Sequence, residues 1–332
     1  MNRRNFIQNT GRFGLALSML DPITDYLIQN NSMQNPSDDF QPFFKLSLAQ
    51  WSLHRAISES KTLSPLDFAQ KAKELGFQGL EYVAQLYDID RKNQLASIKN
   101  LIKELKLRSN DNGMENVIIM VDNEGDLASI GQKERDEAVQ NHYKWIDAAV
   151  ELNCPTIRVN LFGTESEKDF AIWKETSIDA LSKLSEYAAK SKIHVAVENH
   201  GGLSSHAGKL MEVIAAVNHP YCGVLPDFGN FCIKRESGER WGSPCFEEYD
   251  KYLGISEMMP YARGVSAKSY DFDSNGNETT IDYYKMLKIV KKANFNGFIG
   301  VEYEGNRLSE IEGILATKQL LLKVAATLQL GK

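Results

Sequence analysis

Three carboxylates close apolar, strand-like runs in the second half of the chain. Glu198 ends the run VAVE, Asp227 follows GVLP, and Glu302 ends IGVE. A carboxylate at the end of a buried strand needs a partner, because charged groups are almost never buried unpaired. Carboxylates that converge repel one another, and a divalent cation relieves that repulsion. Because oxygen ligands favour hard cations, these residues form a candidate site for Mg²⁺ or Mn²⁺ rather than for a structural zinc.

Other polar residues lie at the ends of similar runs, and several, such as Arg158 and Asn160, are two apart, so that both side chains point the same way. The candidate substrate contacts are His200, Arg158, Asn160 and Asn230, with Trp51 and His54 after the first run. Lys268 is a further candidate, two residues after Ser266, and Glu304 shares one face of its strand with Glu302.

Structural readings of the same residues remain open. Glu198 and Glu302 are also placed to pair with Arg158 or Lys268 in a salt network. Asp227 would equally cap the turn PDFGN, His200 would be a hydrogen-bonded loop histidine, and Trp51 and His54 would be packing residues. The sequence alone does not decide between these readings.

The elements that carry these residues alternate between short β-branched runs and longer segments of helical period, the pattern of a parallel sheet. The predicted strands are 45–50, 79–83, 117–121, 156–160, 194–198, 223–225, 264–268 and 297–302. The predicted helices are 65–75, 98–105, 134–152, 169–191, 209–217, 247–261, 281–293 and 308–328.

Eight strands and eight helices predict an α/β fold, a single-domain parallel (β/α)8 TIM barrel over residues 43–332. Chemistry in such barrels takes place at the carboxyl ends of the strands, where the polar residues above lie. An open doubly wound sheet is the alternative, but no G-x-G-x-x-G follows the first strand. The main insertion, residues 234–246, is predicted to be a loop that could cover a pocket.

Residues 1–42 are set apart as a predicted export signal and linker. The paired arginines Arg3 and Arg4 precede a mildly apolar stretch, which resembles a twin-arginine signal. This predicts an exported, periplasmic protein; a frayed helix on a cytoplasmic protein is the alternative.

The composition and charge of the chain argue against several classes of function. The chain carries 38 Lys and Arg against 44 Asp and Glu, a net charge of −6, and this argues against a nucleic-acid partner. No apolar run is long enough for a membrane span. The four cysteines form no C-x-x-C pair and are expected to be free thiols.

The motifs SLAQWSLH, VENHGG, LPDFGN, VSAKSYDFD and IGVEYEG, in this order, resemble those of the sugar phosphate isomerase/epimerase superfamily, the xylose isomerase-like TIM barrels. The resemblance covers residues 44–328. It implies that Glu198, Asp227 and Glu302 hold one divalent metal, Mn²⁺ or Mg²⁺. The family's fourth ligand is a histidine, and Ser266 stands in its place here. The resemblance therefore leaves open what fills the fourth ligand position of the metal.

The resemblance also implies a reaction. Glu198 and Glu302 would remove and return a proton at the carbon next to a carbonyl, through an ene-diolate, with Lys268 as the third catalytic residue. A free sugar or keto-sugar would be isomerised or epimerised. The alternatives are a lyase or hydratase acting on a 3-keto-glycoside or keto-inositol, and a sugar-binding protein without activity. A small carbohydrate is the expected partner, and the oligomeric state stays open.

Overall fold

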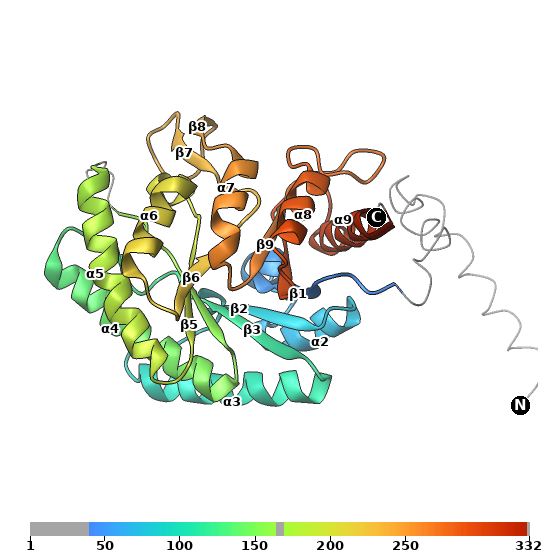
Figure 1. The fold of residues 1–332 in the computed structure, drawn as a ribbon. Helices are drawn as coiled ribbons and strands as arrows, with labels where there is room; N and C mark the ends of the chain where they lie inside the picture. Colours follow the sequence, from blue (N-terminus) through green and yellow to red (C-terminus); the bar gives the residue numbers. More distant parts are fainter. Residues whose placement is uncertain (1–39, 164–168, 331–332) are drawn as a thin grey trace, which may run out of the picture. The chain divides into compact units, whose positions relative to one another are not determined.

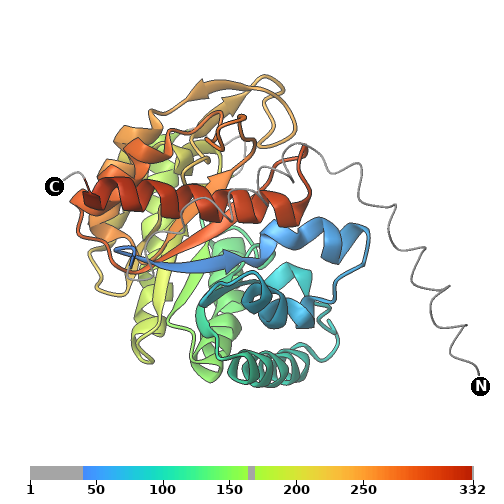
Figure 2. The same cartoon turned by 90° about the vertical axis from the view of Figure 1, so that its right-hand side faces the viewer.

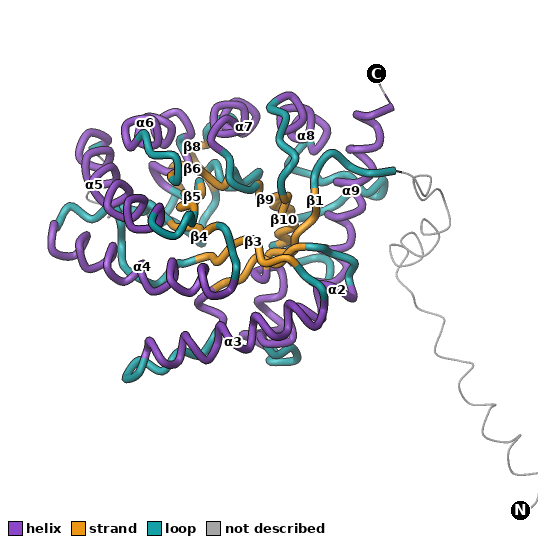
Figure 3. Tube along the Cα trace, turned by 60° about the horizontal axis from the view of Figure 1, so that its bottom comes forward, coloured by secondary structure: helices purple, strands orange, loops and turns teal. Residues whose placement is uncertain are grey.

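Eight parallel strands form a ring inside a layer of helices in the computed structural model, which describes residues 40–163 and 169–330 (Figures 1 and 3). The strands of the ring are β1 (Lys45–Ala49), β2 (Gly79–Val83), β3 (Glu115–Met120), β4 (Thr156–Val159), β5 (His194–Glu198), β6 (Cys222–Leu225), β9 (Val265–Ser269) and β10 (Phe298–Tyr303). The hydrogen-bonded order is β6-β5-β4-β3-β2-β1-β10-β9.

The ring closes between β6 and β9. Two isolated parallel bridges, Val224 with Ala262 and Asp227 with Ser266, join the first and last strands of that order. The Ser266 amide also donates a hydrogen bond to the Pro226 carbonyl oxygen at 2.9 Å. The predicted (β/α)8 TIM barrel is therefore confirmed, and all of its residues from Pro42 onward belong to one compact unit.

Helices follow the strands and cover the outside of the ring. They are α2 (Phe68–Glu74), α3 (Gln94–Asn112), α4 (Gln132–Leu152), α5 (Phe170–Ala189), α6 (Ala207–Val217), α7 (Lys251–Met258), α8 (Tyr283–Lys292) and α9 (Glu310–Leu330). The last of them, α9, packs along β10 and closes the chain back onto the barrel (Figure 2).

The sequence signal for the start of the first helix, a capping serine followed by proline, is confirmed. Ser64 accepts a hydrogen bond from the Leu66 amide, and Pro65 opens a short 3-10 turn that leads into α2. Two predicted helices have wrong limits. The one expected at 98–105 is the 19-residue α3, whose polar stretches hid its true length, and the one expected at 247–261 begins only at Lys251, where Asp250 caps α7.

The insertion predicted as a loop is a β-hairpin. Two antiparallel strands, β7 (Cys232–Arg235) and β8 (Cys245–Glu248), stand above the ring between β6 and α7 (Figure 1). They are short and largely exposed, so neither buries a face that would leave an alternating pattern in the sequence. Cys232 and Cys245 form a disulfide, so the expectation of free thiols is wrong for these two. Cys154 and Cys222 are free and buried, as expected.

The centre of the ring is filled by apolar side chains, as in other barrels of this kind. Its buried members are Ala49, Val83, Val117, Ile118, Met120, Ala196 and Leu225. This packed layer leaves only the carboxyl ends of the strands open for polar chemistry.

The predicted export signal lies in residues 1–42, nearly all of which are outside the described part of the chain. Among the residues that are described, no helix combines the length and apolar character that crossing a bilayer requires.

Candidate active site

Glu198, Asp227 and Glu302 meet at the carboxyl end of the barrel. Glu198 is the last residue of β5, Asp227 follows β6 by two residues, and Glu302 lies near the end of β10. One carboxylate oxygen of each lies within 4.8 Å of one from each of the others. All three side chains are buried. The structure therefore brings together the three carboxylates that the sequence singled out.

Lys268 provides positive charge beside two of these carboxylates. Its ammonium lies 3.5 Å from Glu302 Oε2, 3.8 Å from Asp227 Oδ2 and 3.2 Å from Glu304 Oε1. Burial alone would lower the pKa of Lys268, but Asp227, Glu302 and Glu304 outweigh it and raise the pKa. Lys268 is therefore a permanent cation at the centre of the cluster.

Arg158, on β4, provides the second cation. Its Nε lies 2.9 Å from Glu198 Oε2, and its Nη1 donates to Asp122 on the neighbouring side. The salt network that the sequence left as an alternative thus exists, and it exists together with the carboxylate cluster. Arg158 and Lys268 therefore place a cation beside each of the three clustered carboxylates.

Asp227 has a divided role. Its Oδ1 accepts hydrogen bonds from the amides of Gly229 at 2.8 Å and Asn230 at 2.7 Å, so it does cap the turn PDFGN. Its Oδ2 has no hydrogen-bond donor among the described residues and points at the Lys268 ammonium. Asn230 in turn donates to Glu198 Oε1 at 3.1 Å. The turn therefore links two of the three carboxylates and leaves one oxygen available to a ligand.

Asn199, which the sequence analysis missed, holds this turn in place. Its side chain donates to the carbonyls of Asp227 at 3.0 Å and Asn230 at 3.1 Å and accepts from the Asp227 amide at 2.8 Å. It is fully buried. An asparagine between a candidate glutamate and a candidate histidine carried no signal of its own, because its partners are backbone groups of another strand.

His200 joins the cluster through β4. Its Nδ1 lies 2.9 Å from Asn160 Oδ1, and the Asn160 amide donates to Asp122 Oδ1 at 2.7 Å. Because an amide oxygen only accepts, His200 carries its proton on Nδ1 and leaves Nε2 as an acceptor. Burial, reinforced by Arg158 and Lys268, lowers the pKa of His200 to about 3, which keeps the ring neutral.

Two acidic residues of the site were not predicted. Asp122 follows β3 and accepts from both Arg158 and Asn160. It ends an apolar run, VIIMVD, so the signal used for Glu198 would also have found it. Glu81, in the middle of β2, gave no such signal because apolar residues surround it on both sides.

Glu81 lies inside the barrel, below the cluster. Ser47 Oγ donates to its Oε1 at 2.6 Å, and its Oε2 has no hydrogen-bond partner. A Cβ on Gly300 would come within 2.4 Å of both carboxylate oxygens, so the glycine makes room for them. Burial, with a smaller contribution from Glu302, raises the pKa of Glu81 to about 8.

Burial also raises the pKa of the clustered carboxyl groups. The pKa of Asp227 rises to about 7, because burial and the Glu302 charge together exceed the opposing effect of Lys268. The pKa of Glu198 rises through burial, which the Arg158 charge opposes, and through the charges of Glu302 and Asp227. Glu302, the third carboxylate, accepts a hydrogen bond from Ser266 Oγ at 2.7 Å.

The cluster suits a hard divalent cation. Its donors are carboxylate oxygens within 4.8 Å of one another, and the buried Oδ2 of Asp227 has no hydrogen-bond partner among the described residues. Glu198, Asp227 and Glu302 would hold the ion. At the family's histidine position the hydroxyl of Ser266 instead binds Glu302, so the protein supplies three strong ligands there.

Trp51 and His54 lie at the end of β1. Their rings stack with centroids 4.5 Å apart, and His54 Nδ1 lies 2.7 Å from the Trp51 carbonyl oxygen. Trp51 also packs against the core of the ring. Within residues 40–163 and 169–330 no hydrogen bond or ion pair joins either side chain to the three carboxylates, so their role in binding substrate stays a prediction.

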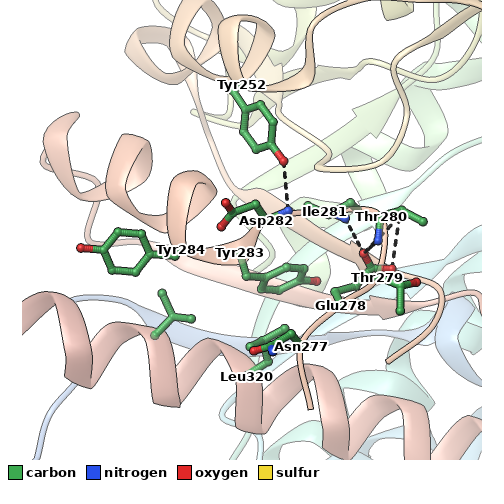
Figure 4. A pocket seen from close by; sticks show the side chains of 11 residues that line it. Tyr252, Asn277, Glu278, Thr279, Thr280, Ile281, Asp282, Tyr283, Tyr284 and Leu320 are labelled. Carbon is green, nitrogen blue, oxygen red and sulfur yellow. Dashed lines mark hydrogen bonds between the residues drawn. The ribbon is translucent and has the colours of Figure 1, made fainter. Parts of the chain in front are cut away.

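A separate cavity of about 400 Å³ lies on the outside of the barrel, between α7, α8 and α9 (Figure 4). The Glu278 carboxylate lines it and accepts from the amides of Thr280 and Ile281 and from the Thr280 hydroxyl. Asp282, which also lines it, caps α8. These acidic groups are occupied in holding the loop, so the cavity does not compete with the carboxylate cluster as a site.

Comparison with known proteins agrees with this fold. The family model described as "Xylose isomerase-like TIM barrel" matches residues 69–323. Among curated proteins, the C-glycoside deglycosidase alpha subunit of Arthrobacter globiformis is 33% identical over 55 residues, which are 17% of this chain and 16% of that protein. The match thus spans about a sixth of that relative.

Solved structures are similar over most of the barrel. The 3-keto-D-glucoside 4-epimerase from E. coli aligns with a TM-score of 0.61 at 16% identity, covering 86% of this chain and 99% of that one. A xylose isomerase-like TIM barrel protein from Mycobacterium smegmatis, in complex with magnesium, aligns with a TM-score of 0.60 at 15% identity, covering 87% and 99%. At these identities the similarity establishes the fold.

Proposed function

The chain belongs to the family of xylose isomerase-like TIM barrels, and on that premise we propose that it is an isomerase or epimerase of a free sugar or keto-sugar. The observation that carries the proposal is the meeting of Glu198 and Glu302, two buried glutamates from β5 and β10, beside the ammonium of Lys268. Two carboxyl groups next to a fixed cation are what proton transfer at the carbon beside a carbonyl requires.

The surroundings of the two glutamates assign their roles. Ser266 Oγ donates to Glu302 at 2.7 Å and the Lys268 ammonium lies 3.5 Å away, and we assign Glu302 the role of the base. Burial raises the pKa of Glu198, whose Oε2 lies 2.9 Å from Arg158 Nε, and we assign Glu198 the role of the group that returns the proton. Two acidic groups in different environments are a common basis for such a division of roles.

The reaction proceeds by proton transfer alone. Glu302 takes the proton from the carbon beside the carbonyl. The electron pair of that C–H bond forms a C=C bond, and the π pair of the carbonyl moves to its oxygen. The ammonium of Lys268 meets the negative charge that develops on that oxygen. For an epimer the carbonyl then re-forms, and the C=C pair takes a proton from Glu198 on the opposite face. For an isomer the proton of the hydroxyl on the deprotonated carbon passes to the charged oxygen, the new carbonyl forms at that carbon, and Glu198 protonates the former carbonyl carbon. Exchange with solvent restores both carboxyl groups.

A divalent cation, Mn²⁺ or Mg²⁺, is part of the proposal. Held by Glu198, Asp227 and Glu302, it would supply additional positive charge to polarise a sugar carbonyl. The proposed contacts to sugar oxygens lie beside the carboxylate cluster and are Arg158, Asn160, Asn230 and His200. His200 Nε2 would accept a hydrogen bond from a sugar hydroxyl.

Solvent exchange tests the two roles separately. Wild-type protein incubated with 3-keto-glucose in deuterated water should incorporate deuterium at the carbon beside the carbonyl and form product, both visible by NMR. Glu302→Gln should lose both. Glu198→Gln should lose product formation and keep exchange, because the base remains.

A matched control comes from the other end of the barrel. Glu115, the exposed first residue of β3, pairs with Lys45, and Glu115→Gln should keep full activity. Turnover by Glu302→Gln at the wild-type rate would refute the mechanism. Tight binding of sugar by the wild type with neither exchange nor turnover would favour a sugar-binding protein instead.

A lyase is the second candidate, and the 33% identity to part of the C-glycoside deglycosidase alpha subunit favours it. The same removal of a proton by Glu302 leads to elimination when a leaving group lies on the next carbon. NMR of an aryl 3-keto-glucoside reaction separates the two: release of the phenol indicates a lyase, and a deuterated glycoside with the phenol still attached indicates an epimerase.

We also propose that the chain is exported. The disulfide between Cys232 and Cys245 supports an oxidising compartment, because such bonds are rare in the reducing cytosol. The twin arginines Arg3 and Arg4 support the same conclusion from the sequence. Replacing both arginines by lysine should retain the protein in the cytoplasm, and secretion at the wild-type level would contradict a twin-arginine route.

A further inference from the structure

The β7–β8 hairpin, residues 232–248, is anchored in the candidate site at its base. Asn230, two residues before Cys232, donates to Glu198, and its carbonyl accepts from Ser205 Oγ at 2.7 Å. Phe231 is fully buried, and its carbonyl accepts from the Tyr249 amide just beyond β8 at 2.9 Å. Both ends of the hairpin are therefore fixed relative to the carboxylate cluster.

The disulfide and Arg235 hold the rest of the hairpin in one shape. Cys232 and Cys245 tie the two strands together with their Cα atoms 5.8 Å apart. The Arg235 guanidinium donates to the carbonyls of Arg240 at 2.8 Å and Ser243 at 2.7 Å, which are both in the connecting loop. A loop of this length that carries its own cross-links is ordered before any ligand binds.

The tip of the hairpin rests on the loops after β4 and β5. Arg240 donates to the Gly163 carbonyl at 3.0 Å, and its guanidinium lies 3.9 Å from the centre of the Phe162 ring. At Gly201, which has a positive φ of 88°, a Cβ would come within 2.9 Å of the Arg240 side chain and 3.3 Å of Trp241. The tip thus reaches the segment that begins with Glu198.

Trp241, at this tip, lies against His200. The two ring centroids are 4.8 Å apart, and His200 is bonded on its other edge to Asn160. Trp241 remains 43% exposed, whereas Glu198 is 2% exposed. A chain of contacts therefore links Glu198 through Arg158, Asp122 and Asn160 to His200, and His200 to a large aromatic ring that is partly open to solvent.

We propose that Trp241 forms a subsite for the aglycone of a glycoside whose keto-sugar ring is bound at the carboxylates. This inference rests on the proposed function and names its substrate class. Trp241 lies outside His200, beyond the groups that act on the reacting ring. A flat ring attached through the glycosidic oxygen would stack on the exposed indole, since aromatic faces favour such contacts. Trp241 is thus a specificity-determining residue that takes no part in proton transfer.

The test compares a glycoside with the free sugar. Calorimetric titrations with 4-nitrophenyl 3-keto-glucoside and with 3-keto-glucose, in the inactive Glu302→Gln protein, give dissociation constants that do not depend on turnover. Trp241→Ala should weaken binding of the glycoside about tenfold, roughly 1.4 kcal/mol, and leave binding of the free sugar unchanged. Trp241→Phe should recover most of the loss.

Two further variants separate the subsite from general damage to the hairpin. Phe246 is 77% exposed on β8 of the same hairpin, and Phe246→Ala should change neither constant. The double variant Cys232→Ser with Cys245→Ser removes the clamp and should weaken binding of the glycoside alone. Equal loss for both ligands in Trp241→Ala, or no loss for either, overturns the inference.

Titrations and turnover assays of the protein with Glu302 intact distinguish this inference from the proposed function. If the wild type binds the glycoside more tightly than the free sugar through Trp241 but turns over neither, the subsite stands and the proposed reaction fails. If turnover occurs and Trp241→Ala lowers kcat for both substrates without changing either KM, the reaction stands and the subsite fails.

Discussion

Glu81→Gln is expected to stabilise the protein at alkaline pH. Glu81 is fully buried inside the barrel, and its Oε2 has no hydrogen-bond partner. Glutamine has nearly the same shape and its carbonyl oxygen can accept the hydrogen bond from Ser47. The substitution therefore removes one ionisable group and little else.

The size of the effect follows from the pKa of Glu81, which rises from 4.5 to about 8 on folding. The folded protein binds this proton more tightly than the unfolded chain does. The contribution to stability is complete below pH 4.5, is lost as the pH rises, and levels off above pH 8. A difference of about 3.5 pKa units at roughly 1.36 kcal/mol each gives about 5 kcal/mol, a large fraction of a typical domain's stability.

Urea unfolding of both proteins at pH 5, 7 and 9 measures the effect. The free energy of unfolding of Glu81→Gln relative to wild type should increase by several kcal/mol between pH 5 and pH 9. Glu115→Gln, at an exposed carboxylate, should show a difference that stays flat across the same range. If Glu81→Gln is equally or less favourable at pH 9 than at pH 5, the account of a buried carboxyl held neutral is refuted.

Two further predictions concern the cluster. Asn199→Ala should cost about 3 kcal/mol of stability, because the carbonyl and amide of Asp227 lose their Asn199 partner and the Asn230 carbonyl keeps only Ser205. Asn123→Ala in an exposed loop should stay within about 0.5 kcal/mol. A neutral Asn199→Ala in urea unfolding would show that water replaces the side chain. Ser266→His should raise the affinity for Mn²⁺, measured by calorimetry, by about tenfold or more, since it adds a ligand beside Glu302. Asp227→Asn should lower this affinity. An unchanged affinity in both variants would mean that the three carboxylates do not hold the ion.

Much of the barrel could be predicted because its signals are local. A run such as VAVE is apolar on both faces because helices cover its outer face and the packed interior of the barrel covers its inner face. A cap such as Ser64 before Pro65 marks a helix start with its own hydrogen bond. Since parallel strands all end at one mouth, carboxylates that end such runs had to come near one another. The positions of Glu198, Asp227 and Glu302 followed from that rule alone.

Other features depended on partners distant in the sequence. Glu81 meets Ser47 and the open space at Gly300, and Asn199 meets backbone groups of the turn after β6. The hairpin was missed for a related reason: its strands pair with each other above the barrel, so no buried face imposes a period on their residues.

The sequence by itself determined the class of fold, the end of the barrel where polar chemistry gathers, and the carboxylates found there, because each depends on the order of residues along a single strand. Only the tertiary structure decided how those carboxylates are charged. The pKa values of Glu198 and Asp227 depend on burial and on the nearby charges of Arg158 and Lys268, and Glu302 accepts a hydrogen bond from Ser266. These groups come from strands that are far apart in the chain. The same is true of Cys232 and Cys245, which became partners because an antiparallel turn brings them within bonding distance.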